Sequence, residues 1–182
     1  MMEGQKQLMN NLYLIGFMGV GKSHFGRLVS EALSYQFFDT DHVIENNEQT
    51  TISEIFKNQG EECFRKLERD LIESGLPNEA CVVACGGGLA IQEGMMSVLK
   101  TKGVVISLFA SKETILERTS TNKNRPLLNV VNPEQQIDQM MNARAPKYLE
   151  ADASIATDGR MPVDIMNHII RTYKTINKVK SS

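Results

Sequence analysis

The chain has 182 residues, of which 41% are hydrophobic and 23% are charged. These proportions are typical of globular domains and exclude a disordered or collagen-like chain. Lysine and arginine total 20 against 22 aspartate and glutamate, which gives a formal net charge of −2. This balance argues against non-specific nucleic-acid binding, which requires a surplus of positive charge. An anionic ligand would have to be held by a local cluster of positive groups.

The sequence gives no sign of export or membrane insertion. Its start lacks a basic region followed by an apolar run, and no apolar stretch approaches the ~20 residues of a membrane span. The three cysteines, Cys63, Cys81 and Cys85, are odd in number and lack the spacing of metal ligands. They are typical of small buried side chains in a reducing compartment. We expect a cytoplasmic protein whose residues 1–182 form a single domain.

Short apolar runs alternate with amphipathic patterns along the chain. Apolar runs rich in β-branched residues indicate strands buried on both faces, and such strands separated by helices indicate a parallel sheet between two helical layers. We therefore predict a three-layer α/β fold. The expected elements, in chain order, are strand 12–15, helix 22–33, strand 37–38, a short helix opened by a capping box at 51–54, helix 61–74, strands 81–85 and 104–108, a helix beginning at 132–133, a weak strand near 154–155 and helix 163–175.

Residues 16–23, Gly-Phe-Met-Gly-Val-Gly-Lys-Ser, match the phosphate-binding pattern G-x-x-x-x-G-K-[ST]. The context also fits, because an apolar strand precedes the loop and an amphipathic helix follows it. Glycines let backbone N–H groups curl around phosphate oxygens, and the helix N-terminus adds its dipole. Lys22 would bring a charge to the β- and γ-phosphates, and Ser23 would offer a hydroxyl to Mg²⁺. The loop predicts a nucleotide-binding site.

Two acidic residues follow the second expected strand. Neither the third nor the fourth expected strand ends in an acidic residue, so Asp39 and Asp41 are the candidates for a carboxylate near the metal. In an extended segment, residues two apart face the same way, so both side chains would point to the carboxyl ends of the strands. The alternative is that Asp41 only caps a helix that starts near His42.

Three further features suggest a site for a second, anionic substrate. Gly86-Gly87-Gly88 follows a buried strand and offers backbone that a ligand can approach closely. Arg144 lies on the apolar stripe of a helix, where a guanidinium needs a partner such as a ligand carboxylate. Arg65 is a second candidate, although it could simply form a surface ion pair with Glu68. Finally, residues 119–124 have no apolar side chain, and we expect a mobile segment there.

Taken in order, these motifs resemble the shikimate kinase family over nearly the whole chain. They are the phosphate-binding loop, Asp-x-Asp at 39–41, Phe-Arg-x-x-Glu at 64–68, the three glycines, Arg-Pro-Leu-Leu at 125–128 and Arg-x-Pro-x-Tyr at 144–148. The resemblance implies a P-loop kinase fold with a five-stranded parallel sheet. It also implies ATP with Mg²⁺ as phosphoryl donor and the 3-hydroxyl of shikimate as acceptor, in a monomer with no nucleic-acid or membrane partner.

The resemblance also implies roles for individual residues. Lys22, Asp41 and Arg125 would be catalytic, with Asp41 at the attacking hydroxyl and Arg125 on a lid at about 119–129. Ser23 and Asp39 would serve Mg²⁺. An acceptor-binding segment would span about 39–75, with Phe56 and Phe64 as its apolar wall. Shikimate would be held by Asp41, Arg65, Gly87 and Arg144, and ATP by Gly19, Val20, Gly21, Lys22, Ser23, His24, Arg118, Arg125 and Arg160.

Two departures from the family pattern are mild, and three alternatives remain. His24 stands where the family usually has threonine, and Cys85 precedes the glycines where another residue is more usual. A nucleoside monophosphate kinase would leave the three glycines without a role. A gluconate-type kinase would lack these glycines and the Phe-Arg-x-x-Glu pattern. A non-catalytic nucleotide-binding switch would need no acceptor pocket, and its Asn-Lys-x-Asp element is not complete at 122–125.

Overall fold

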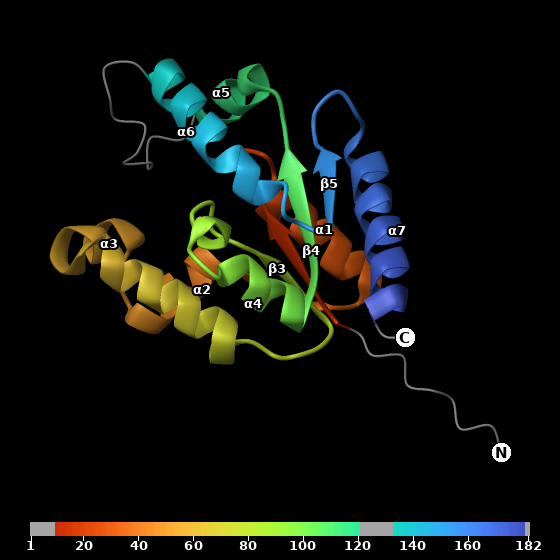
Figure 1. The fold of residues 1–182 in the computed structure, drawn as a ribbon, viewed down its shortest axis with the longest axis horizontal. Coiled ribbons are helices and arrows are strands. Elements are labelled where there is room, and N and C mark those ends of the chain that lie inside the picture. Colours follow the sequence, from red (N-terminus) through yellow and green to blue (C-terminus); the bar gives the residue numbers. More distant parts are fainter. Residues whose placement is uncertain (1–9, 121–132, 181–182) are drawn as a thin grey trace.

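The computed structural model describes residues 10–120 and 133–180 (Figure 1). Five strands form one sheet in the order β2-β3-β1-β4-β5, and all neighbouring strands run parallel. The predicted α/β fold with a five-stranded parallel sheet is therefore confirmed. The strands are β1 (Asn11–Ile15), β2 (Gln36–Asp39), β3 (Cys81–Ala84), β4 (Gly103–Phe109) and β5 (Ala153–Ala156).

The strands at the centre of the sheet show why polar residues do not alternate with apolar ones in these runs. Leu12 of β1 pairs with Val82 of β3 on one side and with Val104 of β4 on the other. All three side chains are fully buried. A strand covered by helices on both faces must be apolar at every position, so these runs are continuous.

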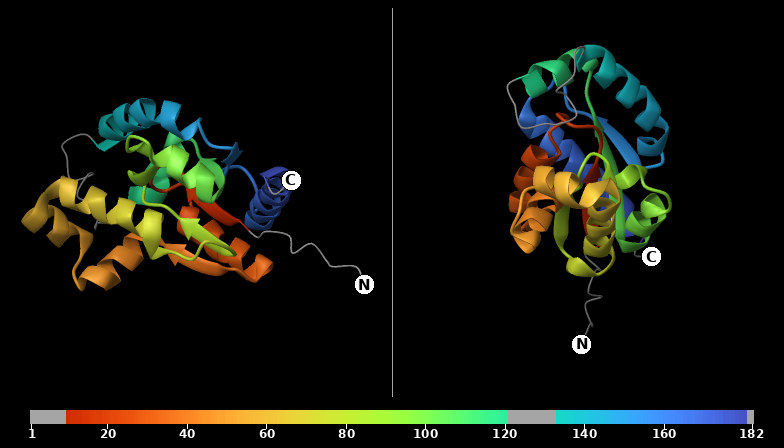
Figure 2. Two further views of the ribbon diagram at one scale, coloured as in Figure 1. Left: turned by 60° about the horizontal axis from the view of Figure 1, so that its bottom comes forward. Right: turned by 90° about the vertical axis from the view of Figure 1, so that its left-hand side faces the viewer.

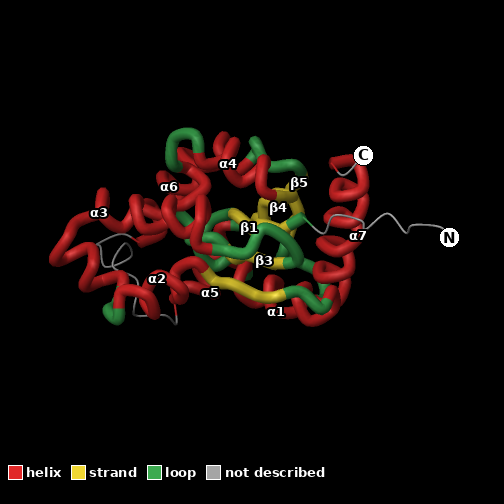
Figure 3. Tube along the Cα trace, turned by 90° about the horizontal axis from the view of Figure 1, so that it is seen from below, coloured by secondary structure: helices red, strands yellow, loops and turns green. Residues whose placement is uncertain are grey.

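Helices cover both faces of the sheet. Helices α1 (Lys22–Leu33) and α7 (Pro162–Lys180) pack against each other and against the strands. Helix α4 (Met95–Lys102), which the sequence did not lead us to expect, packs on β4. Figure 3 shows the strands lying between α1 and α4. Among the described residues, none of the helices has both the length and the apolar character of a membrane span.

Helices α2 (Thr40–Glu48) and α3 (Ile52–Asp70) project from one end of the molecule, away from α7 (Figure 2). The predicted capping box at the start of α3 is confirmed: Thr51 accepts from the Glu54 amide, and the Glu54 carboxylate accepts from the Thr51 amide. Gly60 breaks α3 with a φ of 85°, a left-handed conformation that favours glycine. The expected short helix and helix 61–74 are therefore two halves of α3, extended by a π-helical turn, η1 (Leu71–Gly75).

This projection has an apolar cluster of its own. Ile44, Ile55, Phe64 and Leu71 are buried together, separately from the main core around the sheet. The cluster joins α2 to both halves of α3, so the segment predicted to bind the acceptor packs as a unit.

The remaining elements follow β3 and β4. A short 3₁₀ turn, η2 (Leu89–Ile91), comes after the three glycines, and α5 (Lys112–Ser120) and α6 (Pro133–Tyr148) come after β4. Figure 1 shows the arrowheads of β4 and β5 pointing toward the part of the molecule that contains α5. The first two residues of the expected lid are the end of α5, where Thr119 is buried. The rest of that lid, 121–129, lies outside the described residues.

Candidate active site

The loop between β1 and α1 has the geometry expected of a phosphate-binding loop. Gly16, Gly19 and Gly21 have φ angles of 135°, 79° and 97°, and Gly21 is the N-terminal cap of α1. The Lys22 ammonium donates to the carbonyl oxygens of Gly16 and Phe17, both at 2.9 Å. The ammonium thus spans the loop that a phosphate chain would fill.

Asp39 and Asp41 lie close to this loop, but not in the extended arrangement that we predicted. The prediction was wrong because β2 ends at Asp39 and α2 begins at Thr40. Asp39 is the N-cap of α2, and Asp41 lies in the first turn, so the capping alternative named the wrong residue. The Ser23 hydroxyl donates to Asp39 Oδ2 at 2.5 Å. This contact joins the two residues that we expected to serve a metal.

Thr40, between the two acidic residues, ties them to the glycine loop. Its side chain is fully buried, and its hydroxyl oxygen accepts from the Gly86 amide at 2.8 Å. Asp41 Oδ1 and Glu68 Oε1 both lie against Gly86, in the space that a Cβ would need. Only glycine allows these carboxylates to approach the loop so closely.

Arg65 and Glu68 form an ion pair inside the protein rather than on its surface. The Arg65 guanidinium donates to Glu68 Oε2 at 2.7 Å and to Glu61 Oε1 at 2.8 Å. The Glu68 side chain is 1% exposed, which contradicts the surface-pair interpretation. The Gln92 amide also donates to Glu68 Oε2, at 2.8 Å, whereas Oε1 has no hydrogen-bond partner among the described residues.

Burial dominates the chemistry of Glu68. It raises the pKa of this carboxyl to about 7, against the hydrogen bond and the charge of Arg65, and the Asp41 charge adds to the rise. The folded protein therefore holds the Glu68 proton more tightly than an exposed glutamate would.

Arg65 and Arg144 both lie over aromatic rings. The Arg65 guanidinium carbon is 5.4 Å from the centre of the Phe64 ring and 6.0 Å from that of Phe56. The Arg144 guanidinium carbon is 5.7 Å from the Phe17 ring. These contacts hold the planar cations without using up their hydrogen-bond donors, which leaves N–H groups for an anion.

Arg144 reaches the glycine loop from α6. Its Nη1 is 3.4 Å from the Gly87 carbonyl oxygen, which also accepts from the Tyr148 hydroxyl at 2.6 Å. The predicted apolar stripe of α6 is confirmed, since Ile137 and Tyr148 are buried and Arg144 is half-buried between them along the helix. The structure therefore brings Asp41, Arg65, Gly87 and Arg144 together around one loop.

Arg118 lies on the other side of the phosphate-binding loop. Its guanidinium donates to the Thr157 carbonyl at 3.0 Å, and to Thr157 Oγ1 and the Gly19 carbonyl at 3.3 Å each. Arg160 is exposed, with its Nη1 at 3.1 Å from His168 Nδ1. His24 is also exposed, and its ring packs edge-on against Phe25. Arg125 lies outside the described residues.

The sequence did not lead us to Gln92, Thr157 or the buried position of Glu68. Glu68 was visible three residues after Arg65, yet spacing on a helix does not say which face is covered. Gln92 and Thr157 act across long separations and leave no local pattern. Cys85 is buried beside the site, and this burial raises the pKa of its thiol. Cys81 is buried as well, so the expectation of small buried cysteines is confirmed for these two, whereas Cys63 is only half-buried.

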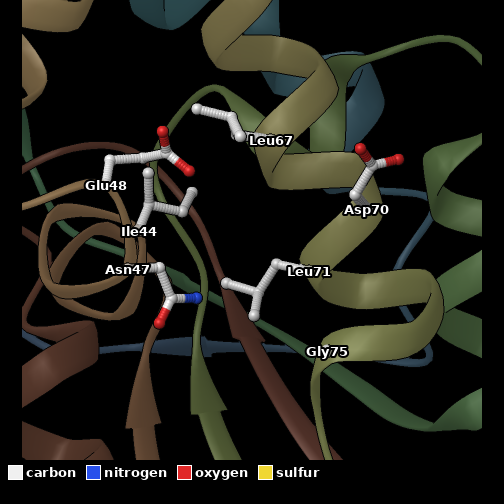
Figure 4. Close-up of a pocket in the computed structure, with 7 residues that line it drawn as sticks. All are labelled: Ile44, Asn47, Glu48, Leu67, Asp70, Leu71 and Gly75. Carbon is white, nitrogen blue, oxygen red and sulfur yellow. The ribbon is translucent and has the colours of Figure 1, made fainter.

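A cavity of about 210 Å³ lies outside this arrangement, between α2 and α3 (Figure 4). Its lining includes the apolar side chains of Ile44, Leu67 and Leu71 and the acidic residues Glu48 and Asp70. It contains none of the residues that we expected to bind substrate or nucleotide. In the described part of the chain, no group of three or more histidine, cysteine, aspartate or glutamate side chains is arranged to hold a metal by itself.

Comparison with known proteins assigns the chain to a protein family. The family model described as shikimate kinase matches residues 18–174. The chain belongs to the shikimate kinase family. The shikimate kinase of Thermodesulfovibrio yellowstonii is 41% identical over 173 residues, which cover 95% of this chain and all of that protein. A shikimate kinase of Thermus thermophilus is 39% identical over 158 residues, 86% of each chain.

Solved structures agree with this assignment. A shikimate kinase from Acinetobacter baumannii in complex with shikimate superposes with a TM-score of 0.87 at 36% identity, covering 93% of this chain and 96% of that one. A gluconokinase from Sinorhizobium meliloti has a TM-score of 0.59 at 13% identity, covering 95% and 96%, and shares the fold alone. As a shikimate kinase family member, the chain is an ATP-dependent kinase that phosphorylates a hydroxyl group of shikimate.

Proposed function

We propose that the chain transfers the γ-phosphoryl group of ATP to the 3-hydroxyl of shikimate, giving shikimate 3-phosphate and ADP. One observation carries the proposal. Asp41, Arg65 and Arg144 converge on the glycine loop at 86–88, next to a phosphate-binding loop. Such a site would bind a substrate carboxylate between the two arginines and direct a substrate hydroxyl at the nucleotide. A hydroxylated ring acid such as shikimate has both groups.

In this proposal the two arginines bind the substrate carboxylate. Arg65 is held by Glu68 and Glu61, and Arg144 by the ring of Phe17 and the Gly87 carbonyl. Both keep further N–H donors, since a guanidinium has five. Two fixed guanidinium groups select an anionic acceptor, and their paired N–H donors match the two oxygens of a carboxylate.

Asp41 is the residue proposed to orient or deprotonate the attacking hydroxyl. It lies in the first turn of α2 and against Gly86, so its carboxylate is fixed relative to the loop. A group that takes a proton must be within hydrogen-bond reach of it, and the contact of Asp41 with the glycine loop supports a role at the acceptor rather than at the nucleotide.

Lys22 is proposed to neutralise the β- and γ-phosphates, leaving its two carbonyl partners when ATP binds. We further propose that Gly19, Val20, Gly21, Ser23 and His24 bind phosphate through their backbone amides, and that Arg118 and Arg160 face the adenine. Arg125 would add charge to the transferring group from the lid, whose closure would exclude water.

Ser23 and Asp39 fit a magnesium ion bound together with the nucleotide. Mg²⁺ prefers oxygen ligands and, in kinases, takes few of them from the protein, the rest being water and phosphate. A hydroxyl and a carboxylate that already meet at 2.5 Å are such a pair of donors. When bound, the ion would neutralise charge on the phosphates.

We also propose that residues 1–182 act as one catalytic unit and as a monomer. The site residues come from elements of a single chain, and the acceptor-binding segment packs through its own apolar cluster. Because the donor is ATP, we expect the protein in the cytoplasm.

An acceptor panel tests the proposal. ADP release is followed by a coupled assay with shikimate, gluconate and nucleoside monophosphates, with and without EDTA. We expect turnover with shikimate only, loss of turnover with EDTA and recovery with added Mg²⁺. Phosphorus–proton correlation NMR of the product then identifies the esterified hydroxyl. Turnover with gluconate alone, or a phosphate on another hydroxyl, would contradict the proposal.

A further inference from the structure

Thr157 is a buried polar residue to which the reaction as proposed gives no role. It directly follows β5, and its side chain is 2% exposed. Its backbone amide donates to the Phe109 carbonyl at 2.8 Å, which continues the pairing of β5 with β4. The backbone is therefore fixed by the sheet, and the position of the hydroxyl follows from it.

The hydroxyl of Thr157 lies between the phosphate-binding loop and Arg118. Its Oγ1 is 2.8 Å from the Val20 carbonyl oxygen, to which it donates, and 3.3 Å from Arg118 Nη1, from which it accepts. A threonine hydroxyl has one proton and two lone pairs, so it satisfies both partners at once. The Phe109 carbonyl, at 3.3 Å from the same oxygen, is a longer alternative acceptor.

The backbone carbonyl of Thr157 adds a third contact to the same guanidinium, since it accepts from Arg118 Nη2 at 3.0 Å. Arg118 Nη1 in turn reaches the Gly19 carbonyl at 3.3 Å. Thr157 thus contacts both terminal nitrogens of the Arg118 guanidinium. Arg118 and Thr157 in turn contact neighbouring carbonyls of the phosphate-binding loop, those of Gly19 and Val20.

Asp158, the next residue, attaches the segment after β5 to the opposite end of α5. Asp158 Oδ2 accepts from the Ser111 amide at 2.6 Å, and this hydrogen bond is the first cause of the lowered pKa of Asp158. The segment after β5 is therefore attached to the start of α5 through Asp158 and to its end through Thr157. Arg118 has little freedom to turn away.

We propose that Thr157 is a positioning residue for nucleotide binding, which fixes the Arg118 guanidinium relative to the phosphate-binding loop. The inference rests on the proposed function in one respect, that Arg118 faces the base of ATP. Thr157 then sets the distance between the site for the base and the site for the phosphates, and so favours a ligand that has both.

The test compares a ligand with a base to one without. Titration calorimetry measures the dissociation constants of ATP and of inorganic tripolyphosphate for the wild-type chain, Thr157→Val and Thr157→Ser. We expect Thr157→Val to weaken ATP binding about three- to tenfold, the range for loss of one or two hydrogen bonds, with a smaller change for tripolyphosphate. Thr157→Ser keeps the hydroxyl and should restore ATP binding.

A double-mutant cycle with Arg118→Ala checks that the effect passes through the arginine. In the Arg118→Ala background, Thr157→Val should change ATP binding less than twofold, because the group that it positions is gone. Should Thr157→Val not fold, Thr157→Ala replaces it throughout, since it removes the hydroxyl without adding a methyl group.

Three results would overturn the inference: unchanged ATP binding in Thr157→Val, an equal loss for ATP and tripolyphosphate, or full additivity with Arg118→Ala. None of these measurements uses shikimate. A wild-type chain that binds ATP but does not phosphorylate shikimate would refute the proposed function and leave the role of Thr157 standing.

Discussion

The proposed nucleotide side and the proposed acceptor side of this site are built in different ways. On the nucleotide side, Lys22 and Arg118 are held by backbone carbonyls of Gly16, Phe17, Gly19 and Thr157. On the acceptor side, Arg65 is held by the carboxylates of Glu61 and Glu68.

The kind of partner determines how each side of the site responds to a substitution. Backbone carbonyls stay in place when a side chain is replaced, so Lys22 keeps its partners when neighbouring side chains change, whereas Arg118 also depends on the Thr157 hydroxyl. Side-chain partners are lost with a single substitution, and a buried carboxylate left without its cation is costly. We therefore expect substitution of Arg65 to affect both binding and stability, and substitution of Lys22 to affect function alone.

Lys22→Met should give the largest effect and the cleanest separation of function from stability. Loss of a fixed positive charge at the transferring phosphoryl group should lower kcat/KM by about 10²- to 10³-fold. The free energy of unfolding in urea should change by less than about 0.5 kcal/mol, because the two carbonyl partners of Lys22 can bond to water instead. The control is Lys174→Met, at an exposed position on α7. A loss of less than tenfold in kcat/KM would contradict the role of Lys22.

Arg144→Ala and Arg65→Ala separate two kinds of anchor on the acceptor side. Each should raise the KM for shikimate by about 10- to 150-fold, equivalent to roughly 1.5–3 kcal/mol for hydrogen bonds to a charged group, and leave the KM for ATP within about twofold. Only Arg65→Ala should also lower the free energy of unfolding, by at least about 1 kcal/mol, because it removes the cation from the buried Glu68.

Steady-state kinetics and urea denaturation of both variants provide the measurements, with Arg171→Ala on the exposed face of α7 as the control. An unchanged KM for shikimate in either variant would remove that arginine from the acceptor site. Equal stability of the two variants would contradict the contrast drawn between their anchors.

Glu68→Gln should change how stability depends on pH. The pKa of Glu68 is raised to about 7 by burial, above its ordinary value of 4.5. Between these two values the unfolded chain releases the proton and the folded chain keeps it, so rising pH favours unfolding. Above pH 7 both states are ionised, and the loss is complete.

The wild-type chain should therefore lose on the order of 2–3 kcal/mol more stability than Glu68→Gln between pH 5 and pH 7.5. Urea denaturation at several pH values gives the free energy of unfolding of each protein. The test compares how steeply this free energy falls with pH in the two proteins, not its absolute value. Parallel pH dependence would mean that Glu68 is ionised in the folded chain throughout this range.

Arg160→Ala should give the smallest effect. Its guanidinium is exposed and already contacts His168 and the Asp164 carbonyl, so it contributes little fixed charge to the nucleotide. We expect the KM for ATP to rise about two- to threefold, with the KM for shikimate unchanged. A rise above tenfold in steady-state kinetics would mean that Arg160 lies closer to the nucleotide than its present contacts indicate.

Much of the fold and the geometry of the phosphate-binding loop could be predicted from the sequence. The boundaries of α1, Lys22–Leu33, were predicted without error, since the glycines of the loop and the apolar stripe define both ends. The short apolar helix α4 was missed, because eight residues carry little periodic signal. Arg144 was found through its place on an apolar stripe, a local pattern that implies a partner.

The geometry of Asp39 and Asp41 was wrongly predicted for a physical reason. Alternation along an extended chain holds only while the strand lasts, and β2 ends at the first of the two acidic residues. The Asp39 side chain can cap a helix, and the helix begins at once. Strand ends of this kind are decided by what the next element packs against.

By itself the sequence determined the alternation of buried strands and helices and the phosphate-binding loop, because these depend on periodicity and on neighbouring residues. Only the tertiary structure decided that Glu68 is buried against Gly86 and that Thr157 meets Val20 across 137 positions of the chain. Such contacts arise when separate elements pack against one another. Burial then raises the pKa of Glu68 and determines the hydrogen-bond partners of Thr157. No local pattern of residues encodes these two properties.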